Sequence, residues 1–416
     1  MVKTKNQNCV LIGEKLSHSF SPMIHSHLAD YPYSLAEIKR EDLESFIKSD
    51  KYTSANVTIP YKVAVMEYLD EISDEARAIG CVNCITHTKE GKLRGDNTDF
   101  YGLSYLIKSS NIDLSGKKVL ILGSGGSFLT ARAVCNSLDA SYVICVSRQG
   151  EVNYNNVYSL HGNADIIINT SPVGMYPNNL ECKIDLEKFK DIKGVFDIVF
   201  NPSKTKLLLD AEKLGIPAFG GLTMLVAQAK RASEIFTNEQ IPDREIDRIK
   251  KIIEEKTLNV ILVGMPGCGK STIATALGET LEREVIDTDE EIVQNSKMPI
   301  PEIFSTFGEG VFRSLEHNEI KNAGKQSGKI ISTGGGAVTI TDNYEPLHQN
   351  GIIVFIKRDI DKLSRDGRPL SIGADLQKMY EKRLPLYEKF ADIVVENDSD
   401  IDSCVDKIIT LIRGQK

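Results

Sequence analysis

Two glycine-rich loops, each directly after a short apolar run, constrain this chain more than any other feature. The first run, 118–122, leads into Gly-Ser-Gly-Gly-Ser at 123–127, and the second run, 259–263, leads into Gly-Met-Pro-Gly-Cys-Gly-Lys-Ser at 264–271. Glycines between a strand and a helix let backbone N–H groups approach a phosphate at the N-terminus of that helix. The two loops follow different nucleotide-binding patterns, so the sequence predicts two separate nucleotide sites.

The rest of the chain predicts the fold class. Strand-like runs alternate with amphipathic helical patterns, which is typical of α/β architecture with parallel sheets, and 416 residues are enough for about three domains. The isoleucines at 246, 249, 252 and 253 form one apolar stripe, so the helix that carries them should pack on a core. Only about 256–258 then remain before the next strand, which predicts a short, stiff junction.

The composition of the chain indicates which partners it binds and in which compartment it occurs. The net charge of -8 argues against nucleic acid or an anionic membrane as the main partner, and no apolar run approaches the roughly 18 residues of a membrane span. Residues 1–13 hold only a four-residue apolar core, which predicts a first strand rather than a signal peptide. We therefore expect a cytoplasmic protein that acts on small molecules, of unspecified oligomeric state.

The eight cysteines and the clustered histidines favour packing over metal binding. Most of the cysteines are expected in apolar strands, as at Cys9, Cys135 and Cys145. A CxxC pair spans 81–84, but no second pair completes a zinc site. Three histidines lie within 18–27, without a neighbouring carboxylate to complete a metal site.

The first glycine loop has the pattern of a dinucleotide site. The strand after it ends in Ser147 and Arg148, without the acidic residue that holds the ribose hydroxyls of NAD. An arginine at this place suits a 2′-phosphate, so the sequence predicts NADP(H) in preference to NAD.

Seven segments resemble the motifs of shikimate dehydrogenase and occur in the family order. They are 18–22, 55–62, 82–83, 95–99, 123–127, 169–175 and 224–228. The resemblance implies that Lys62 and Asp99 are the catalytic pair: Lys62 protonates the carbonyl oxygen of 3-dehydroshikimate while NADPH delivers hydride, and Asp99 holds the reacting oxygen. The implied substrate ligands are Ser19, Ser21, Thr58, Lys62, Asn83, Asp99 and Gln228. The implied NADP ligands are Gly123, Ser124, Gly125, Gly126, Ser127, Ser147, Arg148, Ile198 and Gly221.

Several positions depart from that family's pattern. Ser147 replaces the usual asparagine of the 2′-phosphate site and Val152 its second basic residue, so NADP selectivity is expected to be lower than usual. Phe128 replaces a small residue at the start of the helix. Phe200 replaces a tyrosine, so one substrate-facing hydroxyl is missing.

The second loop matches the complete P-loop pattern GxxxxGK[ST]. Its backbone N–H groups should wrap the phosphates of ATP, Lys270 should reach the β and γ oxygens, and Ser271 should ligate Mg²⁺. The segments 287–289, 303–316, 333–337, 368–370 and 383–387 resemble those of shikimate kinase.

This second resemblance assigns further roles. Asp289 orients or deprotonates the attacking hydroxyl, and Asp287 supports Mg²⁺ beside Ser271. The remaining implied substrate ligands are Arg313, Gly335 and Arg383, of which the two arginines grip the carboxylate. The implied catalytic residues are Lys270, Asp289 and Arg368. The implied ATP ligands are Gly267, Cys268, Gly269, Lys270, Ser271, Thr272, Arg365 and Arg368. Only two residues separate Arg365 from Arg368, so a short lid is expected.

Together the two resemblances predict three domains and two activities. Residues 1–105, completed by returning helices at 222–255, form an α/β substrate domain; 106–221 form a Rossmann-type NADP domain; and 257–416 form a P-loop domain like that of nucleoside monophosphate kinases. The predicted enzyme reduces 3-dehydroshikimate to shikimate and phosphorylates it to shikimate 3-phosphate. Two alternatives stay open: a quinate/shikimate dehydrogenase with broader cofactor use, or one inactive domain that serves as a binding module.

Overall fold

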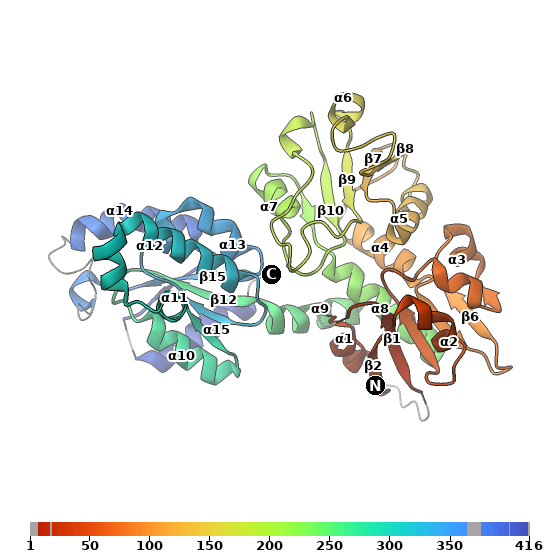
Figure 1. Cartoon of the computed structure of the whole chain (residues 1–416), viewed down its shortest axis with the longest axis horizontal. Helices are drawn as coiled ribbons and strands as arrows, with labels where there is room; N and C mark the ends of the chain where they lie inside the picture. Colours follow the sequence, from red (N-terminus) through yellow and green to blue (C-terminus); the bar gives the residue numbers. More distant parts are fainter. Residues whose placement is uncertain (1–6, 17–18, 364–375, 399, 415–416) are drawn as a thin grey trace. The chain divides into compact units, whose positions relative to one another are not determined.

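The chain folds into α/β architecture, as predicted, with three sheets. The computed structural model describes residues 7–16, 19–363, 376–398 and 400–414. Contacts divide the chain into a first unit of residues 1–175, 181–200 and 207–253, and a second unit of 176–180, 201–206 and 254–416 (Figure 1). Among the described helices, none is long and apolar enough to cross a membrane.

The first sheet of the first unit has six strands in the order β2-β1-β3-β5-β6-β4. The strands are β1 (Cys9–Gly13), β2 (Tyr33–Glu37), β3 (Ser54–Val57), β4 (Glu71–Ile72), β5 (Cys84–His87) and β6 (Leu93–Asp96). β1 pairs in parallel with both β2 and β3, whereas β5 runs antiparallel to β3 and β6. Three helices belong to this part: α1 (Ser21–Leu28), α2 (Leu43–Ile47) and α3 (Asp74–Ile79). All residues of β1 and β3 are buried, as expected for strands covered on both faces.

The second sheet of this unit has five parallel strands in the order β11-β10-β9-β7-β8. The strands are β7 (Lys118–Leu122), β8 (Tyr142–Val146), β9 (Ile166–Asn169), β10 (Gly194–Asp197) and β11 (Ala218–Phe219), and the helices are α5 (Gly126–Ser137), α6 (Val157–His161) and α7 (Lys206–Lys213). Val119 and Ile121 join one apolar cluster and Leu120 and Leu122 another, because alternate side chains of a strand face opposite sides. The chain leaves β7 for β8 and returns to β9 on the other side. This reversal creates a switch point, where α/β sheets bind ligands.

Two long helices connect these sheets. α4 (Thr98–Ser109) and α8 (Leu222–Thr237) pack against each other. Leu103 of α4 and Met224 of α8 belong to the apolar cluster of the second sheet. Farther along α8, Phe236 packs in a cluster with Cys9 of β1. α8 therefore carries the chain from the second sheet back to the first.

Helix α9 (Arg244–Thr257) buries one apolar face in the first unit. Ile246, Ile249 and Ile253 are fully buried and join a cluster with Ile24 and Leu28 of α1. Ile252, the fourth isoleucine of the predicted stripe, is only half-buried. α9 ends at Thr257 and the next strand begins at Asn259, so the junction is shorter than predicted.

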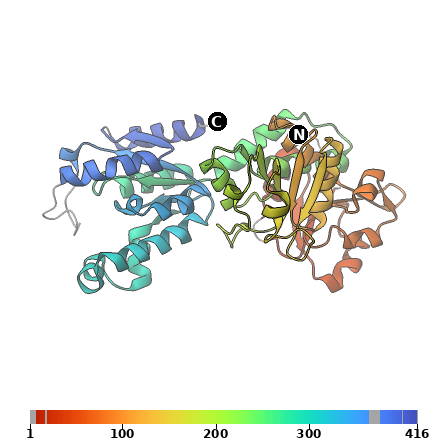
Figure 2. The ribbon, with the colours of Figure 1, turned by 90° about the horizontal axis from the view of Figure 1, so that it is seen from above.

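The sheet of the second unit also has five parallel strands, in the order β13-β14-β12-β15-β16. They are β12 (Asn259–Val263), β13 (Val285–Asp287), β14 (Ile330–Ser332), β15 (Gly351–Lys357) and β16 (Ile393–Glu396). The helices are α10 (Lys270–Leu281), α11 (Thr288–Ser296), α12 (Ile300–Gly324), α13 (Tyr344–His348), α14 (Leu376–Phe390) and α15 (Ile401–Gly414). They cover both faces of this sheet, with α10 and α15 on one side and α13 and α14 on the other (Figures 1 and 2). α12 is broken at Gly308, where φ is +81°.

Six of the eight cysteines are buried, and one prediction of their location is wrong. Cys135 lies in helix α5, not in a strand, because a short apolar run does not by itself distinguish a buried strand from a buried helix. All eight thiols are free, and no cluster of metal-ligating side chains occurs among the described residues. His25 is buried and stacks on Tyr33 with ring centroids 3.9 Å apart, and its Nδ1 hydrogen-bonds the Tyr31 hydroxyl at 2.7 Å. His18 lies outside the described residues.

The buried face of α9 generates a stability prediction. Ile249→Ala should lower the free energy of unfolding of the first unit by about 2–5 kcal/mol, because it removes apolar contacts and leaves a cavity. Urea unfolding followed by hydrogen exchange of peptides from α1 and α8 measures this loss. Lys251→Ala, at an exposed position of the same helix, is the matched control and should change stability by less than about 0.5 kcal/mol. An equal effect of both substitutions would contradict the packing role.

Candidate functional site

A nearly buried ion pair marks the site of the first unit. Lys62 follows β3, and its Nζ lies 2.5 Å from Oδ2 of Asp99, with side chains only 14% and 8% exposed. Asp99 is the second residue of α4, where the helix dipole favours a carboxylate. Surface ion pairs contribute roughly 0–1 kcal/mol, but this pair is largely removed from water and therefore has a defined geometry. The structure brings together the two predicted catalytic residues.

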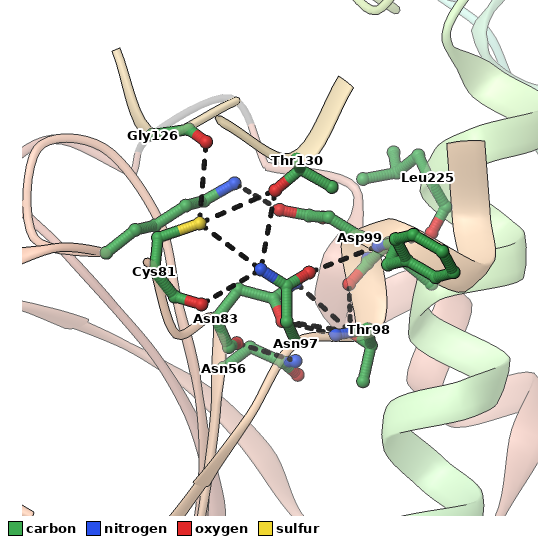
Figure 3. Close-up of polar contacts among 12 residues, drawn as sticks. Asn56, Cys81, Asn83, Asn97, Thr98, Asp99, Gly126, Thr130 and Leu225 are labelled. Atoms are coloured by element: carbon green, nitrogen blue, oxygen red, sulfur yellow. Dashed lines mark hydrogen bonds and ion pairs between the residues drawn. The ribbon is translucent and has the colours of Figure 1, made fainter. Parts of the chain in front are cut away.

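Two more predicted ligands, Asn83 and Gln228, form one buried network with Thr98 beside this pair. The backbone N–H of Thr98 donates to Oδ1 of Asn83 at 2.7 Å, and Nδ2 of Asn83 donates to the Thr98 hydroxyl at 3.1 Å. The Thr98 hydroxyl also lies 3.3 Å from Oε1 of Gln228, whose Nε2 donates to the carbonyl of Leu225 (Figure 3). The network thus joins the residue before β5, the start of α4 and the middle of α8, and it holds Asn83 close to Gln228.

The predicted hydroxyl ligands lie at the ends of β1 and β3. The hydroxyl of Ser19 donates to that of Ser21 at 3.1 Å, at the start of α1. Ser21 hydrogen-bonds the hydroxyl of Tyr33, which donates to Oδ1 of Asn56 at 2.8 Å. Burial raises the pKa of Tyr33 well above its usual value, so this hydroxyl stays protonated. The sequence analysis assigned no role to Tyr33, which lies in no recognised motif, or to Asn56, although Asn56 belongs to the recognised segment 55–62.

Thr58 completes this group. It directly follows β3, and its backbone N–H donates to the carbonyl of Ile12 at 2.9 Å. A side chain on Gly13 would meet Cγ2 of Thr58 at 2.7 Å, so the ends of β1 and β3 lie in direct contact.

The first glycine loop reaches the catalytic pair. Gly123 directly follows β7, Gly125 is the N-cap of α5, and Gly126 is the first residue of that helix. A Cβ on Gly126 would lie 3.4 Å from Cβ of Lys62. The helix N-terminus expected to hold a dinucleotide phosphate is therefore in van der Waals range of the predicted proton donor. Ser124 and Ser127 lie in this same loop.

Other predicted dinucleotide ligands lie at the same edge of the second sheet. Ser147 follows β8 and Ile198 follows β10, at the carboxyl ends of parallel strands. Gly221 lies against Ile198, since a Cβ on Gly221 would come within 2.1 Å of the Ile198 carbonyl oxygen. Arg148 is exposed, as a ligand for a phosphate on the ribose requires.

The three departures from the dehydrogenase pattern have structural consequences. Val152 packs into the apolar cluster of the second sheet and adds no charge beside Arg148. The ring of Phe128 lies 5.4 Å from the Arg132 guanidinium on the next turn of α5. The ring of Phe200 lies 5.3 Å from that of Phe20.

The P-loop of the second unit has the features that its sequence predicts. It joins β12 to α10 and includes Gly267, Cys268 and Gly269, and Thr272 follows it in the first turn of α10. Nζ of Lys270 donates to the carbonyls of Gly264 at 3.0 Å and Met265 at 3.1 Å. The Ser271 hydroxyl donates to Oδ2 of Asp287 at 2.8 Å. Asn397, which was not predicted, supports the loop because its Nδ2 donates to the Cys268 carbonyl at 2.8 Å.

A charged cluster lies near this loop. Arg313 donates to Glu316 at 2.6 Å and to Glu309 at 3.1 Å. Oδ1 of Asp289 and Oε1 of Glu316 are buried without a hydrogen-bond partner among the described residues. A Cβ on Gly334 would lie 2.8 Å from the first oxygen and 2.5 Å from the second, so both face the same point. Glu316 belongs to a recognised segment, but sequence reasoning assigned it no role.

The glycine triplet connects this cluster to Arg383. A Cβ on Gly336 would lie 2.2 Å from Nη1 of Arg313, so a side chain there would displace the Arg313 guanidinium. Nη1 of Arg383 donates to the Gly335 carbonyl at 3.0 Å, and the Tyr387 hydroxyl donates to the same oxygen at 2.6 Å. The predicted residues Asp289, Arg313, Gly335 and Arg383 are thus brought together, whereas Arg365 and Arg368 lie outside the described residues.

The electrostatics of this cluster favour a protonated carboxyl at mildly acidic pH. Burial, followed by the negative charges of Asp287 and Glu316, raises the pKa of Asp289 to about 6. Burial also raises the pKa of Glu316, although Arg313 opposes this shift. Burial alone would lower the pKa of Arg313, but Glu316 and Glu309 raise it, so the guanidinium stays charged. A carboxylate with a pKa near neutrality is suited to exchange a proton with a ligand.

Two family models match separate parts of the chain. The shikimate dehydrogenase substrate binding domain matches residues 11–85, and shikimate kinase matches residues 266–413. The chain is also 36% identical over 269 residues to the shikimate dehydrogenase (NADP(+)) of Clostridium beijerinckii, a match that covers 59% of this chain and 97% of that protein.

Solved structures of shikimate dehydrogenases also match only one part of the chain. Shikimate dehydrogenase 1 from Peptoclostridium difficile is 35% identical with a TM-score of 0.55, and the match covers 59% of this chain and 96% of that one. A chorismate mutase/shikimate 5-dehydrogenase fusion protein from Clostridium acetobutylicum is 34% identical with a TM-score of 0.57, over 61% of this chain and 99% of that one. The P-loop unit begins where these similarities end.

The raised pKa of Asp289 predicts how stability depends on pH. The pKa rises from 3.8 when unfolded to about 6 when folded, so the contribution of this group is complete below pH 3.8 and is lost as pH rises through 6. Asp289→Asn should therefore stabilise the second unit at pH 7.5 by on the order of 2 kcal/mol, and not at pH 4. Thermal unfolding of both proteins at the two pH values measures the difference. Glu290→Gln, at the exposed neighbouring position, should give no such gain; a pH-independent effect of Asp289→Asn would contradict the assignment.

Proposed function

This chain belongs to the shikimate dehydrogenase family and continues into a shikimate kinase domain, and we propose that both parts act on one small acid. The first unit reduces 3-dehydroshikimate to shikimate with NADPH, and the second phosphorylates the shikimate 3-hydroxyl with ATP. The observation that carries this proposal is the approach of the glycine loop to Lys62 of the Lys62–Asp99 pair, since a Cβ on Gly126 would lie 3.4 Å from Cβ of Lys62.

In the first reaction, bound NADPH supplies a hydride to the carbonyl carbon of the substrate. Lys62 donates a proton to the carbonyl oxygen as negative charge develops there, and the product is an alcohol. Asp99 holds the Lys62 ammonium at 2.5 Å and accepts a hydrogen bond from the new hydroxyl. Asn83, Gln228 and the hydroxyls of Ser19, Ser21 and Thr58 orient the ring, so that one face meets the cofactor.

In the second reaction, Asp289 accepts the proton of the attacking hydroxyl. Its pKa of about 6 leaves it ionised at pH 7 yet able to take up a proton. Lys270 stabilises the charge that develops on the transferring phosphoryl group. Arg313 and Arg383 bind the substrate carboxylate, which arginine can grip with two hydrogen bonds. We assign Arg368, with Arg365, to the lid.

A magnesium ion fits the oxygen atoms beside the P-loop. The Ser271 hydroxyl and the Asp287 carboxylate lie 2.8 Å apart, and both are hard oxygen donors of the kind that Mg²⁺ prefers. When bound, Mg²⁺ would neutralise phosphate charge; Ser271 and Asp287 would hold it on the side of the loop that faces β13.

The same proposal includes the boundaries of three domains and a cytoplasmic location. Residues 1–105 with 222–255 bind substrate, 106–221 bind NADP, and 257–416 form the kinase. The free thiols agree with a reducing cytoplasm. The complete catalytic set of each unit argues against the alternative of an inactive binding module, and the adjoining kinase favours shikimate over quinate as the substrate.

The two-site proposal predicts separable activities. Lys62→Ala should lower NADPH-linked turnover by about 10²–10⁴-fold, the range for loss of a positioned proton donor, and leave phosphorylation unchanged. Lys270→Ala should lower phosphorylation by at least about 10²-fold and leave reduction unchanged. A coupled assay with 3-dehydroshikimate, NADPH and ATP–Mg²⁺ follows both reactions.

Each variant carries its own folding control, because the other activity reports on the same chain. Lys92→Ala, which removes an exposed ion pair with Glu71, should alter neither activity. Loss of both activities in a variant that unfolds like the wild type would refute the two-site proposal.

A single exposed cation should determine cofactor preference. Arg148→Gln should lower the kcat/KM for NADPH by about tenfold, with little change for NADH, because a charged hydrogen bond to the 2′-phosphate is lost. Lys117→Gln, at the amino end of β7 and so at the opposite edge of the sheet, is the control. If the ratio of the two kcat/KM values does not change, the 2′-phosphate contact lies elsewhere.

A further inference from the structure

A buried polar cluster lies between the catalytic pair and the cofactor helix. It consists of Cys81, Asn97 and Thr130, whose exposed fractions are 0%, 3% and 1%. Figure 3 shows it beside Asp99, with Gly126 above it. We call these three residues the interhelix cluster.

Asn97 connects every member of the interhelix cluster. Its Oδ1 accepts a hydrogen bond from the backbone N–H of Phe100 at 3.1 Å and so caps α4. Its Nδ2 donates to the Cys81 carbonyl at 3.0 Å, and lies 3.2 Å from Sγ of Cys81 and 3.3 Å from the Thr130 hydroxyl. One side chain thus ties the start of α4 to the interior of α5.

Cys81 adds a second tie to the same helix. Its thiol donates to the Gly126 carbonyl at 3.4 Å and lies 3.5 Å from the Thr130 hydroxyl. Burial raises the pKa of this thiol, so it acts as a neutral hydrogen-bonding group rather than as a reactive thiolate. Its CxxC partner Cys84 packs in a different cluster, with Cys9 and Phe236. The motif therefore does not act as a pair.

The connected elements are those that hold the reacting groups. Asp99 lies two residues after Asn97, and Gly126 lies against Lys62 at the N-terminus expected to carry the dinucleotide. Because these bonds are buried, water cannot replace them when one is broken. A change in their geometry moves α5 relative to Lys62 and Asp99.

We propose that Asn97, acting through Thr130, is a positioning residue that sets the distance between the hydride donor and the acceptor carbon. It touches neither substrate nor cofactor. The inference rests on the proposed function, since it takes Lys62 and Asp99 as the groups that meet the substrate.

The test separates the two roles of the Asn97 side chain. Asn97→Ser keeps an oxygen that can cap α4 but cannot reach Thr130, and Thr130→Val removes only the hydroxyl. Single-turnover hydride transfer, followed by NADPH absorbance in the full-length protein at saturating ligands, should slow by about 10–100-fold in both. With NADPH deuterated at the transferred position, the rate should be lower still than with ordinary NADPH. The Kd for NADPH should change by less than about threefold. Thr130→Ser should restore the rate.

The matched control is Ser73→Ala. Ser73 caps α3 by accepting a hydrogen bond from the Ala76 backbone N–H at 3.3 Å, so its loss weakens a helix of the same unit without removing any hydrogen bond of the interhelix cluster. This control should lower Tm but leave the hydride-transfer rate within about twofold of wild type.

Three outcomes would overturn the proposal. In the first, Asn97→Ser and Thr130→Val transfer hydride as fast as Ser73→Ala while Lys62→Ala is inactive, which makes the cluster a packing feature only. In the second, the rate at saturation is kept and only the Kd for NADPH rises, which makes it a binding feature. In the third, Lys62→Ala transfers hydride at the wild-type rate; that result refutes the proposed function itself, and the inference with it.

Discussion

Parallel pairing of strands is the constraint on which both sites depend. Because the strands of a parallel sheet end at the same edge, the loops that follow them meet there, and each of the two glycine loops leads directly into the N-terminus of a helix. In the first unit this brings Gly123, Ser147 and Ile198 together at the carboxyl ends of β7, β8 and β10. In the second it brings the P-loop after β12 close to Asp287 and Thr333. Two different chemistries thus use one arrangement of backbone.

Buried charge distinguishes the two sites. In the first unit Lys62 and Asp99 compensate each other at 2.5 Å, with side chains only 14% and 8% exposed, so the proposed proton donor is held largely out of solvent. In the second, three carboxylates (Asp287, Asp289 and Glu316) lie near one another, and the positive charges of Lys270 and Arg313 offset them only in part. Burial, reinforced by this excess of negative charge, raises the pKa of Asp289, which suits the proton-accepting role that we propose for it. Ionising Asp289 therefore costs more free energy in the folded state than in the unfolded state.

Much of the fold could be predicted because its signals are local. Runs such as 118–122 and 259–263 are strands, and a helix begins within each glycine loop, at Gly126 and at Lys270. The errors occur where one pattern permits two structures: Cys135 lies in a helix, and Ile252 lies at the margin of the buried face of α9. The supporting residues Tyr33, Asn56, Asn97 and Asn397 could not be assigned roles, because their partners lie far away in the chain or carry no distinctive spacing.

The sequence by itself determined the chemistry: two loops for two nucleotides, a lysine and a carboxylate for one, and paired arginines with an aspartate for the other. The two loops are residue types at short spacings, which the chain order alone specifies, whereas the roles of the lysine, the carboxylates and the arginines are those that the resemblance to the two families implies. Only the tertiary structure decided that Gly126 lies against Lys62, that Glu316 joins Arg313 beside Asp289, and that Asn97 connects α4 to α5. Such contacts depend on burial and on distances between segments far apart in the chain, which are set when sheets and helices pack. Two glycine loops in a sequence become two active sites only through that packing.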